Sequence, residues 1–405
     1  MHMELLNLLF VFLAIVTGTI GTAYAIPVII SVAKQKGLID VPDTERKIHR
    51  GKIPTLGGIA MFAGFLISYS IWVGTTIPAS YPFLVAALRI LLFIGIKDDI
   101  LVISPRKKFL AQVGASALVV IGGNVRITHF DGFLGLHDGV PEVLAILATI
   151  FAFLIIINAF NLIDGIDGLA GGVTLLGAIF FGIWFFANGY QAEAILAAAL
   201  AGTSIGFLIY NHHPAKIFMG DTGSLTTGMI MSVLAFRLIA LAPESSAIPL
   251  QTPTVFAFSL MIIPMFDTFR VIMIRVLNGR APFSADSRHL HHCLLRFGYN
   301  HKEICILLGT AAIIIMVTSY FINHLDVHLY GLIIMVMATA VMPLGWLIKR
   351  IVRKEYINKR SKLFDRKAFM EDMIKPCLTN NGNGLDSKPR EQGYVPFNIK
   401  KFPKA

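Results

Sequence analysis

The sequence predicts an all-α polytopic membrane protein with about eleven transmembrane helices, an outside N-terminus and a cytoplasmic C-terminus. Hydrophobic residues make up 55% of the 405 residues and charged residues only 15%, whereas soluble domains average about 45–50% apolar and about 25% charged residues. Apolar segments of the length needed to cross a bilayer recur along the chain. Lys and Arg gather in alternate loops between these segments, as expected when the basic loops face the cytoplasm.

Eleven apolar segments are candidates for membrane spans. They lie near residues 5–30, 54–74, 80–97, 108–123, 142–160, 170–187, 191–210, 222–241, 253–274, 304–322 and 329–348. The fourth is short and Gly-rich, and only the Asn188-Gly189 turn separates the sixth from the seventh. The first segment contains an Ala-Tyr-Ala sequence at 23–25 that resembles a signal-peptidase site. We interpret it as an uncleaved helix, because Glu4 rather than a basic residue precedes it.

The distribution of basic residues sets the predicted orientation and the domain limits. Lys and Arg concentrate in segments 34–52, 97–108 and 275–302 and in the tail. The predicted domains are therefore a transmembrane domain, 1–350, and a basic cytoplasmic tail, 351–405, which is either disordered or lies on the membrane surface. The net charge of +11 then reflects membrane orientation, and we expect no nucleic-acid partner.

Two further features bear on the class of protein. The three cysteines form no CxxC pair, which argues against a disulfide framework or a structural zinc site. No internal repeat is evident, which disfavours a secondary transporter. A transporter of anionic lipids or nucleotide sugars remains the alternative from another class.

Five acids lie on the predicted cytoplasmic side. Asp98 and Asp99 end the third span, Asp164 and Asp167 follow the fifth, and Asp221 begins the eighth. One acid at a helix end can simply be solvated, but ionisable groups near the hydrocarbon are costly and usually functional. Adjacent carboxylates such as the first pair repel each other, which suits a general base or a site beside a cation.

A Gly-rich motif spans 158–172, NAFNLIDGIDGLAGG. Asn161, Asp164 and Asp167 recur at three-residue spacing, which places them near one face of a helical turn. Such oxygen ligands suit Mg²⁺, which usually takes few protein ligands and keeps phosphate oxygens and water. The alternative is a Gly-rich loop with capping Asp and Asn side chains.

A second motif spans 211–224, NHHPAKIFMGDTGS. Here Asp221 opens a span whose N-terminal N–H groups would attract phosphate, and its carboxylate could add a metal ligand. Phe218 could stack on a base or belong to ordinary packing. The basic triplet Arg106-Lys107-Lys108, near the first acid pair, could bind phosphate or merely follow the orientation rule.

A histidine motif spans 284–298, SADSRHLHHCLLRFG. His289, His291 and His292 are surrounded by arginines, which favours a diphosphate-binding role over zinc binding or structure. The basic inside loop with Arg46, Lys47 and His49 could bind anions or anionic lipid. Asp267 and Arg270, three residues apart, are interpreted mainly as a mutually neutralising pair.

Together these motifs resemble the polyprenyl-phosphate N-acetylhexosamine-1-phosphate transferases (glycosyltransferase family 4), from the first span to the last. The resemblance implies exchange of UMP on a UDP-sugar for a lipid phosphate, with Mg²⁺ or Mn²⁺ as cofactor. It also implies the metal ligands Asn161 and Asp221, the catalytic acids Asp98, Asp99, Asp164 and Asp167, and the substrate-binding residues Lys108, Asn211, Phe218, His289, His291 and His292. We add Arg46, Lys47 and His49 as candidate substrate-binding residues.

The His-Leu-His-His order separates this chain from the relatives that make peptidoglycan precursors, which carry three consecutive histidines. It resembles the branch that starts O-antigen, enterobacterial common antigen and teichoic acid chains on undecaprenyl phosphate, commonly from UDP-GlcNAc. UDP-MurNAc-pentapeptide is the alternative donor, and a covalent aspartyl intermediate is the alternative mechanism. The implied setting is the bacterial plasma membrane, with membrane lipids as neighbours, and a homodimer is left open.

Overall fold

A computed structural model describes residues 2–38, 53–74, 77–101, 103–127, 131–132, 135, 141–279 and 289–378, with side chains described between residues 4 and 352. Two units divide after Lys349. Apart from one isolated bridge residue, Ile53, the regular structure of the described residues is helical, which confirms the all-α class.

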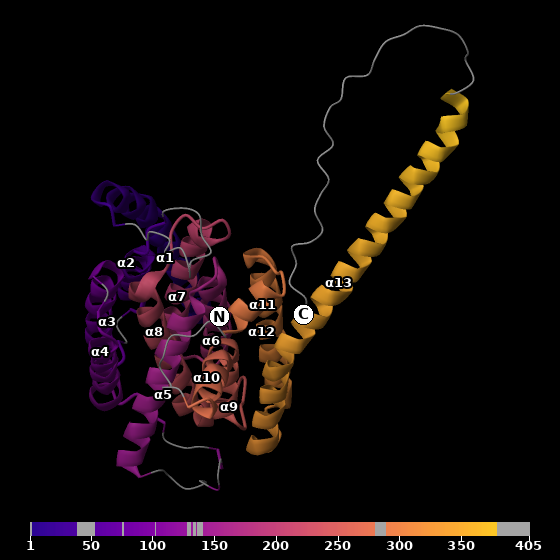
Figure 1. The fold of residues 1–405 in the computed structure, drawn as a ribbon. Coiled ribbons are helices and arrows are strands. Elements are labelled where there is room, and N and C mark those ends of the chain that lie inside the picture. Colours follow the sequence, from indigo (N-terminus) through magenta and orange to yellow (C-terminus); the bar gives the residue numbers. More distant parts are fainter. Residues whose placement is uncertain are drawn as a thin grey trace. The chain divides into compact units, whose positions relative to one another are not determined.

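Figure 1 shows the helices in chain order. Their bounds are α1 His2–Lys36, α2 Gly57–Trp72, α3 Tyr81–Leu101, α4 Pro105–Ala117, η1 Leu118–Gly122, α5 Glu142–Ile163, α6 Leu169–Ala187, α7 Gln191–Asn211, α8 Gly220–Leu241, η3 Ala242–Glu244, α9 Pro253–Ser259, α10 Ile262–Leu277, α11 Leu290–Arg296, α12 His301–Ile322 and α13 Val327–Leu378.

Seven helices in the described part of the chain are long and apolar enough to cross a membrane, and the bent pair α9–α10 makes an eighth if it counts as one span. The seven are α1, α5, α6, α7, α8, α12 and the first half of α13. The helix α2 is apolar but has only 16 residues. The helix α3 carries charged residues at its C-terminal end, and α4 carries them at its N-terminal end. A multi-span α-helical protein is therefore confirmed, and the count of eleven and the orientation stay predictions.

The predicted ninth span, 253–274, is wrong as a continuous helix. It consists of α9 and α10, which meet at an angle of 85°. Pro264 explains the position of the break, because a proline lacks an N–H group and its ring clashes with the carbonyl four residues earlier. That carbonyl belongs to Leu260, where α9 has ended. The backbone of the predicted tail is helical up to Leu378, and residues 379–405 lie outside the described residues.

The start of α8 lies deep within the first unit. This helix packs against α2, α3 and α5, and nearly all of its residues are buried. Two glycines permit the close approach: a Cβ on Gly58 would lie 2.0 Å from the backbone nitrogen of Gly223, and one on Gly95 would lie 2.5 Å from the Cα of Thr222. The absence of side chains at these positions lets α2 and α3 enclose the first turn of α8.

Candidate active site

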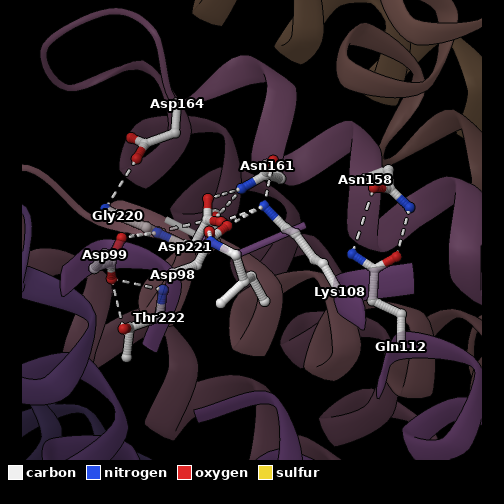
Figure 2. Close-up of polar contacts among 12 residues, drawn as sticks. Asp98, Asp99, Lys108, Gln112, Asn158, Asn161, Asp164, Gly220, Asp221 and Thr222 are labelled. Atoms are coloured by element: carbon white, nitrogen blue, oxygen red, sulfur yellow. Dashed lines mark hydrogen bonds and ion pairs between the residues drawn. The ribbon is translucent and has the colours of Figure 1, made fainter. Parts of the chain in front are cut away.

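Four helix ends bring the site together: the end of α3, the start of α4, the end of α5 and the start of α8. Figure 2 shows the polar side chains that they contribute. Five residues joined by direct contacts are Asp98, Asp99, Lys108, Asn161 and Asp221. All five were predicted as site residues, and the fold brings them into one cluster.

Lys108 is the centre of this cluster. Its ammonium lies 3.2 Å from a carboxylate oxygen of Asp98 and also pairs with the carboxylate of Asp221. It lies 3.5 Å from the amide oxygen of Asn161. The three charged side chains are 15–21% exposed, so the pairing neutralises two neighbouring carboxylates that water only partly solvates.

Asn161 holds the other side of Asp221. Its amide nitrogen donates to Asp221 Oδ1 at 2.6 Å and to Ser224 Oγ at 2.9 Å. Oxygens from α3, α5 and α8 thus converge on one cation, the Lys108 ammonium. Because hard oxygen ligands are those that Mg²⁺ prefers, the residues present fit a magnesium ion, with Asp98, Asp221 and Asn161 as available donors.

Asp99 has a different environment from its neighbour Asp98. Its carboxylate accepts hydrogen bonds from the backbone N–H groups of Asp221, at 2.8 Å, and Thr222, at 3.0 Å, and from the Thr222 hydroxyl at 2.6 Å. These N–H groups belong to the first turn of α8 and have no partner within the helix. The geometry therefore favours a capping role for Asp99 over the predicted catalytic role, which stays a prediction.

Asp164 ends α5 and accepts the N–H group of Gly220 at 3.2 Å. Removal from water raises the pKa of Asp164 well above its ordinary value, the Gly220 hydrogen bond opposes this only in part, and the nearby acids Asp99 and Asp221 raise it further. The fold thus favours the neutral form of this carboxyl group in the absence of a bound cation.

Asp167, three residues later, is buried beside two histidines. His213 Nδ1 lies 2.7 Å from one carboxylate oxygen, and His301 Nδ1 lies 3.2 Å from the other. The N–H group of Ala215 donates at 3.1 Å. Burial alone would raise the pKa of Asp167, but the contacts with His301, His213 and Ala215 outweigh it and lower the pKa. The two acids of one motif therefore have opposite electrostatic environments.

The two histidines beside Asp167 were not predicted. His213 lies within the 211–224 motif, which could have identified it, whereas His301 begins α12 and carries no local signal. With Asp167 they place three possible ligand atoms within 4.8 Å of one another. Such a nitrogen-rich set suits a transition metal better than Mg²⁺.

Asn211 is only 2% exposed and links two loops. Its side-chain oxygen accepts the N–H group of Gly168 at 2.9 Å, and its side-chain nitrogen donates to the carbonyl of Ile217 at 2.8 Å. Both polar atoms of the side chain bond to the protein backbone, so Asn211 connects the Gly168 turn to the Ile217 segment. Phe218 is half-buried, and its backbone N–H group donates a hydrogen bond to the carbonyl of Pro54 at 2.8 Å. Contacts of either residue with a nucleotide stay predictions.

The histidine motif is attached to α10. Asp267 pairs with Arg270 at 2.9 Å, which confirms the predicted neutralising pair. The same carboxylate also accepts hydrogen bonds from His289 Nδ1 at 3.0 Å and from the N–H group of Leu290 at 2.7 Å.

His291 reaches the loop of Asp164. A Cβ on Gly165 would lie 2.7 Å from its Nε2 atom, so the imidazole lies directly against this glycine. Burial, and to a smaller extent the neighbouring His292, lowers the pKa of His291 to about 3. The His291 side chain is therefore neutral at physiological pH. The ring centroid of His292 lies 4.3 Å away. Arg46, Lys47 and His49 lie outside the described residues.

One further pair near the site escaped the sequence interpretation. Asn158 of α5 donates to Gln112 of α4 at 2.9 Å, and Gln112 Nε2 lies 3.4 Å from the Asn158 side-chain oxygen. Figure 2 shows this pair beside Lys108. It joins the two helices that carry Lys108 and Asn161.

Comparison with known proteins agrees with this arrangement. A model of glycosyl transferase family 4 matches residues 81–239. The chain is 30% identical to a probable undecaprenyl-phosphate N-acetylglucosaminyl 1-phosphate transferase of Bacillus subtilis, over 77% of this chain and 84% of that protein. It is 31% identical to a decaprenyl-phosphate N-acetylglucosaminephosphotransferase of Mycobacterium tuberculosis, over 72% and 77%.

A third relative is the undecaprenyl-phosphate alpha-N-acetylglucosaminyl 1-phosphate transferase of Escherichia coli O157:H7, 28% identical over 82% of this chain and 89% of that protein. The matched family region contains α3 to α8 almost completely, and hence all the residues of the Lys108 cluster. The resemblance predicted from the motifs is confirmed: the chain belongs to glycosyl transferase family 4 and is an enzyme of the polyprenyl-phosphate N-acetylhexosamine-1-phosphate transferase family.

Proposed function

We propose that this enzyme transfers GlcNAc-1-phosphate from UDP-GlcNAc to undecaprenyl phosphate and releases UMP. The observation that carries the proposal is the position of Lys108, whose ammonium is held by oxygens from three helices beside the start of α8. An ammonium group in this position offers a point charge to the oxygens of a diphosphate. The names of the relatives, which act on undecaprenyl or decaprenyl phosphate, support the acceptor and the sugar.

The reaction requires positioning and charge neutralisation. An oxygen of the lipid phosphate attacks the β-phosphorus of UDP-GlcNAc, and the bond from that phosphorus to the bridging oxygen breaks, so UMP leaves. Lys108 binds phosphate oxygens as a point charge. Mg²⁺ or Mn²⁺, when held by Asp98, Asn161 and Asp221, would neutralise negative charge on the diphosphate.

Asp98 orients Lys108 rather than acting mainly as a base. A phosphate monoester has a second pKa of about 6, so the lipid phosphate is mostly ionised at neutral pH. Little proton transfer is then needed. The contact between Asp98 and Lys108 at 3.2 Å fits this orienting role.

The charge asymmetry of the sequence supports a site at the cytoplasmic face of a bacterial plasma membrane. Lys and Arg are concentrated in the loops that adjoin the site and in the sequence that follows the apolar part of α13, Val327–Val352. The donor UDP-sugar would then enter from the cytoplasm, and the lipid acceptor from the bilayer. The His-Leu-His-His order supports a glycan-initiating product over the pentapeptide-linked one.

The test uses purified protein, undecaprenyl phosphate, Mg²⁺ and separate radiolabelled donors: UDP-GlcNAc, UDP-GalNAc and UDP-MurNAc-pentapeptide. We expect a lipid-linked product with UDP-GlcNAc, loss of product with EDTA, and recovery with excess Mg²⁺. A product only with the pentapeptide donor would overturn the proposed sugar, and no lipid-linked product with any donor would overturn the proposed reaction.

One variant and one incubation without lipid test the roles within the site. Asp221→Asn keeps the shape of the side chain but removes its charge, and near-wild-type turnover by this variant would refute the proposed metal site. Incubation of the enzyme with UDP-GlcNAc but without lipid separates direct transfer from a covalent aspartyl intermediate, because only the covalent route releases UMP under these conditions.

A further inference from the structure

The histidine motif is held in place by a residue far from it in the sequence. Asp267, on α10, is 5% exposed, and His289 is 3% exposed. One carboxylate oxygen of Asp267 lies 3.0 Å from His289 Nδ1, and the other accepts the N–H group of Leu290 at 2.7 Å. No side-chain cap comes from the N-cap residue of α11, His289 itself. The carboxylate of another helix therefore supplies the cap for α11.

The position of His291 depends on this attachment. The rings of His289 and His291 are nearly parallel, at 8°, with centroids 5.9 Å apart. His291 is 2% exposed and lies against Gly165, next to Asp164. A shift of the start of α11 would therefore move His291 away from the loop that carries two of the predicted catalytic acids.

The attachment also determines which nitrogen of His289 is occupied. Its Nδ1 atom faces Asp267, so Nε2 is the nitrogen left for another group. This Nε2 atom is buried, and among the residues that the structure describes none forms a hydrogen bond with it. A buried imidazole nitrogen of this kind is suited to form a hydrogen bond with a bound substrate.

We propose that Asp267 is a positioning residue for sugar-phosphate transfer, which acts through His289 to hold the histidine motif against the Asp164 loop. This inference rests on the proposed function for its activity readout. The guanidinium of Arg270 lies 2.9 Å from the same carboxylate and balances part of its charge. Misplacement of a positioned group by about 1 Å can cost on the order of 100-fold in rate.

The experiment is a double-mutant cycle on the full chain with Asp267→Asn, His289→Ala and the double variant. We expect each single variant to lower kcat about 10- to 100-fold with little change in KM for the UDP-sugar. The double variant should lose no more than the worse single variant, because both changes break one linkage. Asp267→Glu, which keeps the charge, should recover part of the rate lost in Asp267→Asn.

A matched control is another ion pair, between the buried Glu193 and the partly buried Arg237. The Nε atom of Arg237 donates to the Glu193 carboxylate at 2.9 Å. Arg237 lies 16 residues beyond Asp221 on α8, or about 24 Å along the helix. Glu193→Gln should lower thermal stability but leave kcat within about twofold and combine additively with His289→Ala. Additive losses in the Asp267–His289 cycle would overturn the proposal.

Hydrogen exchange separates this proposal from the proposed function, since it needs no turnover. In Asp267→Asn we expect faster exchange in segment 289–297 and unchanged exchange in α8. Faster exchange with no lipid-linked product from the wild-type enzyme would leave the positioning role intact and overturn the reaction. Unchanged exchange in 289–297 would overturn the positioning role whatever the enzyme turns over.

Discussion

Lys108 and Asp221 form an ion pair across 113 residues of sequence, joining α4 to the first turn of α8. The same ammonium contacts Asp98 at 3.2 Å. Two carboxylates from different helices therefore share one cation beside the first turn of α8. This relationship defines the part of the site that can be tested most directly.

Lys108→Met should lower kcat/KM by on the order of 100- to 1,000-fold, because the variant loses the charge that opposes the diphosphate and leaves Asp98 and Asp221 to repel it. Lys108→Arg should retain more activity, since it keeps the charge but changes the geometry. Steady-state kinetics with UDP-GlcNAc measures both. Arg126→Met is the control, because Arg126 pairs with the exposed Glu142 outside the site. Equal effects of Lys108→Met and Arg126→Met would contradict the assignment.

Asp99→Asn should act mainly on stability. The variant weakens the cap of α8, and loss of a helix cap typically costs about 0.5–2 kcal/mol. Thermal unfolding in detergent measures the loss, and Thr222→Val, which removes one of the three donors to Asp99, should produce a smaller loss of the same kind. A large fall in kcat in Asp99→Asn without any fall in stability would instead favour the catalytic role.

Asp164→Asn and Asp167→Asn should change stability in opposite directions. The raised pKa of Asp164 means that its ionisation opposes folding. Its cost is absent below the ordinary Asp pKa of about 3.9, grows as pH rises from there to the raised pKa, and stays constant above the raised pKa. At neutral pH without divalent cations, Asp164→Asn should therefore be more stable than the wild type, although less active.

The lowered pKa of Asp167 has the reverse consequence. Its stabilisation is present above about pH 3.9 and is lost as pH falls through the lowered pKa, so Asp167→Asn should be less stable at neutral pH. Thermal unfolding from acidic to neutral pH in EDTA tests the pair. Destabilisation by both substitutions at neutral pH would show that the environment of Asp164 does not oppose its charge.

His291→Gln should leave the shape of the pH–rate profile unchanged. The pKa of His291 is lowered to about 3 by burial and by His292, so this side chain stays neutral throughout the range from about pH 5 to about pH 8 in which histidines usually titrate. The variant should lower the rate without removing a titration step. Loss of an inflection in that range would show that His291 carries a proton during the reaction.

Part of the site was predictable because its signals are local. The motif 158–172 carries Asn161, Asp164 and Asp167, and their spacing predicted one face of a helical turn. The helix α5 instead ends at Ile163, and Asp167 contacts His213 and His301 while Asn161 contacts Asp221. The capping role of Asp99 was not predictable, since Asp98 and Asp99 are adjacent and chemically identical. Only the packing of α3 on α8 determines which carboxylate faces the helix terminus and which faces Lys108.

The same distinction applies to the fold. The length of the apolar segments and the distribution of charge are local properties, and they were sufficient to indicate a multi-span helical protein. They could not show that Pro264 turns one predicted span into two helices bent by 85°, since proline in a membrane helix is tolerated where neighbouring groups compensate.

Sequence patterns thus sufficed for the membrane class and the family, because each depends on composition or on spacing within one segment. The pairing of Lys108 with Asp221, and of Asp267 with His289, required the folded chain. These contacts join segments 113 and 22 residues apart. Their formation depends on how closely whole helices approach, which glycines such as Gly58 and Gly95 permit and which no local pattern encodes.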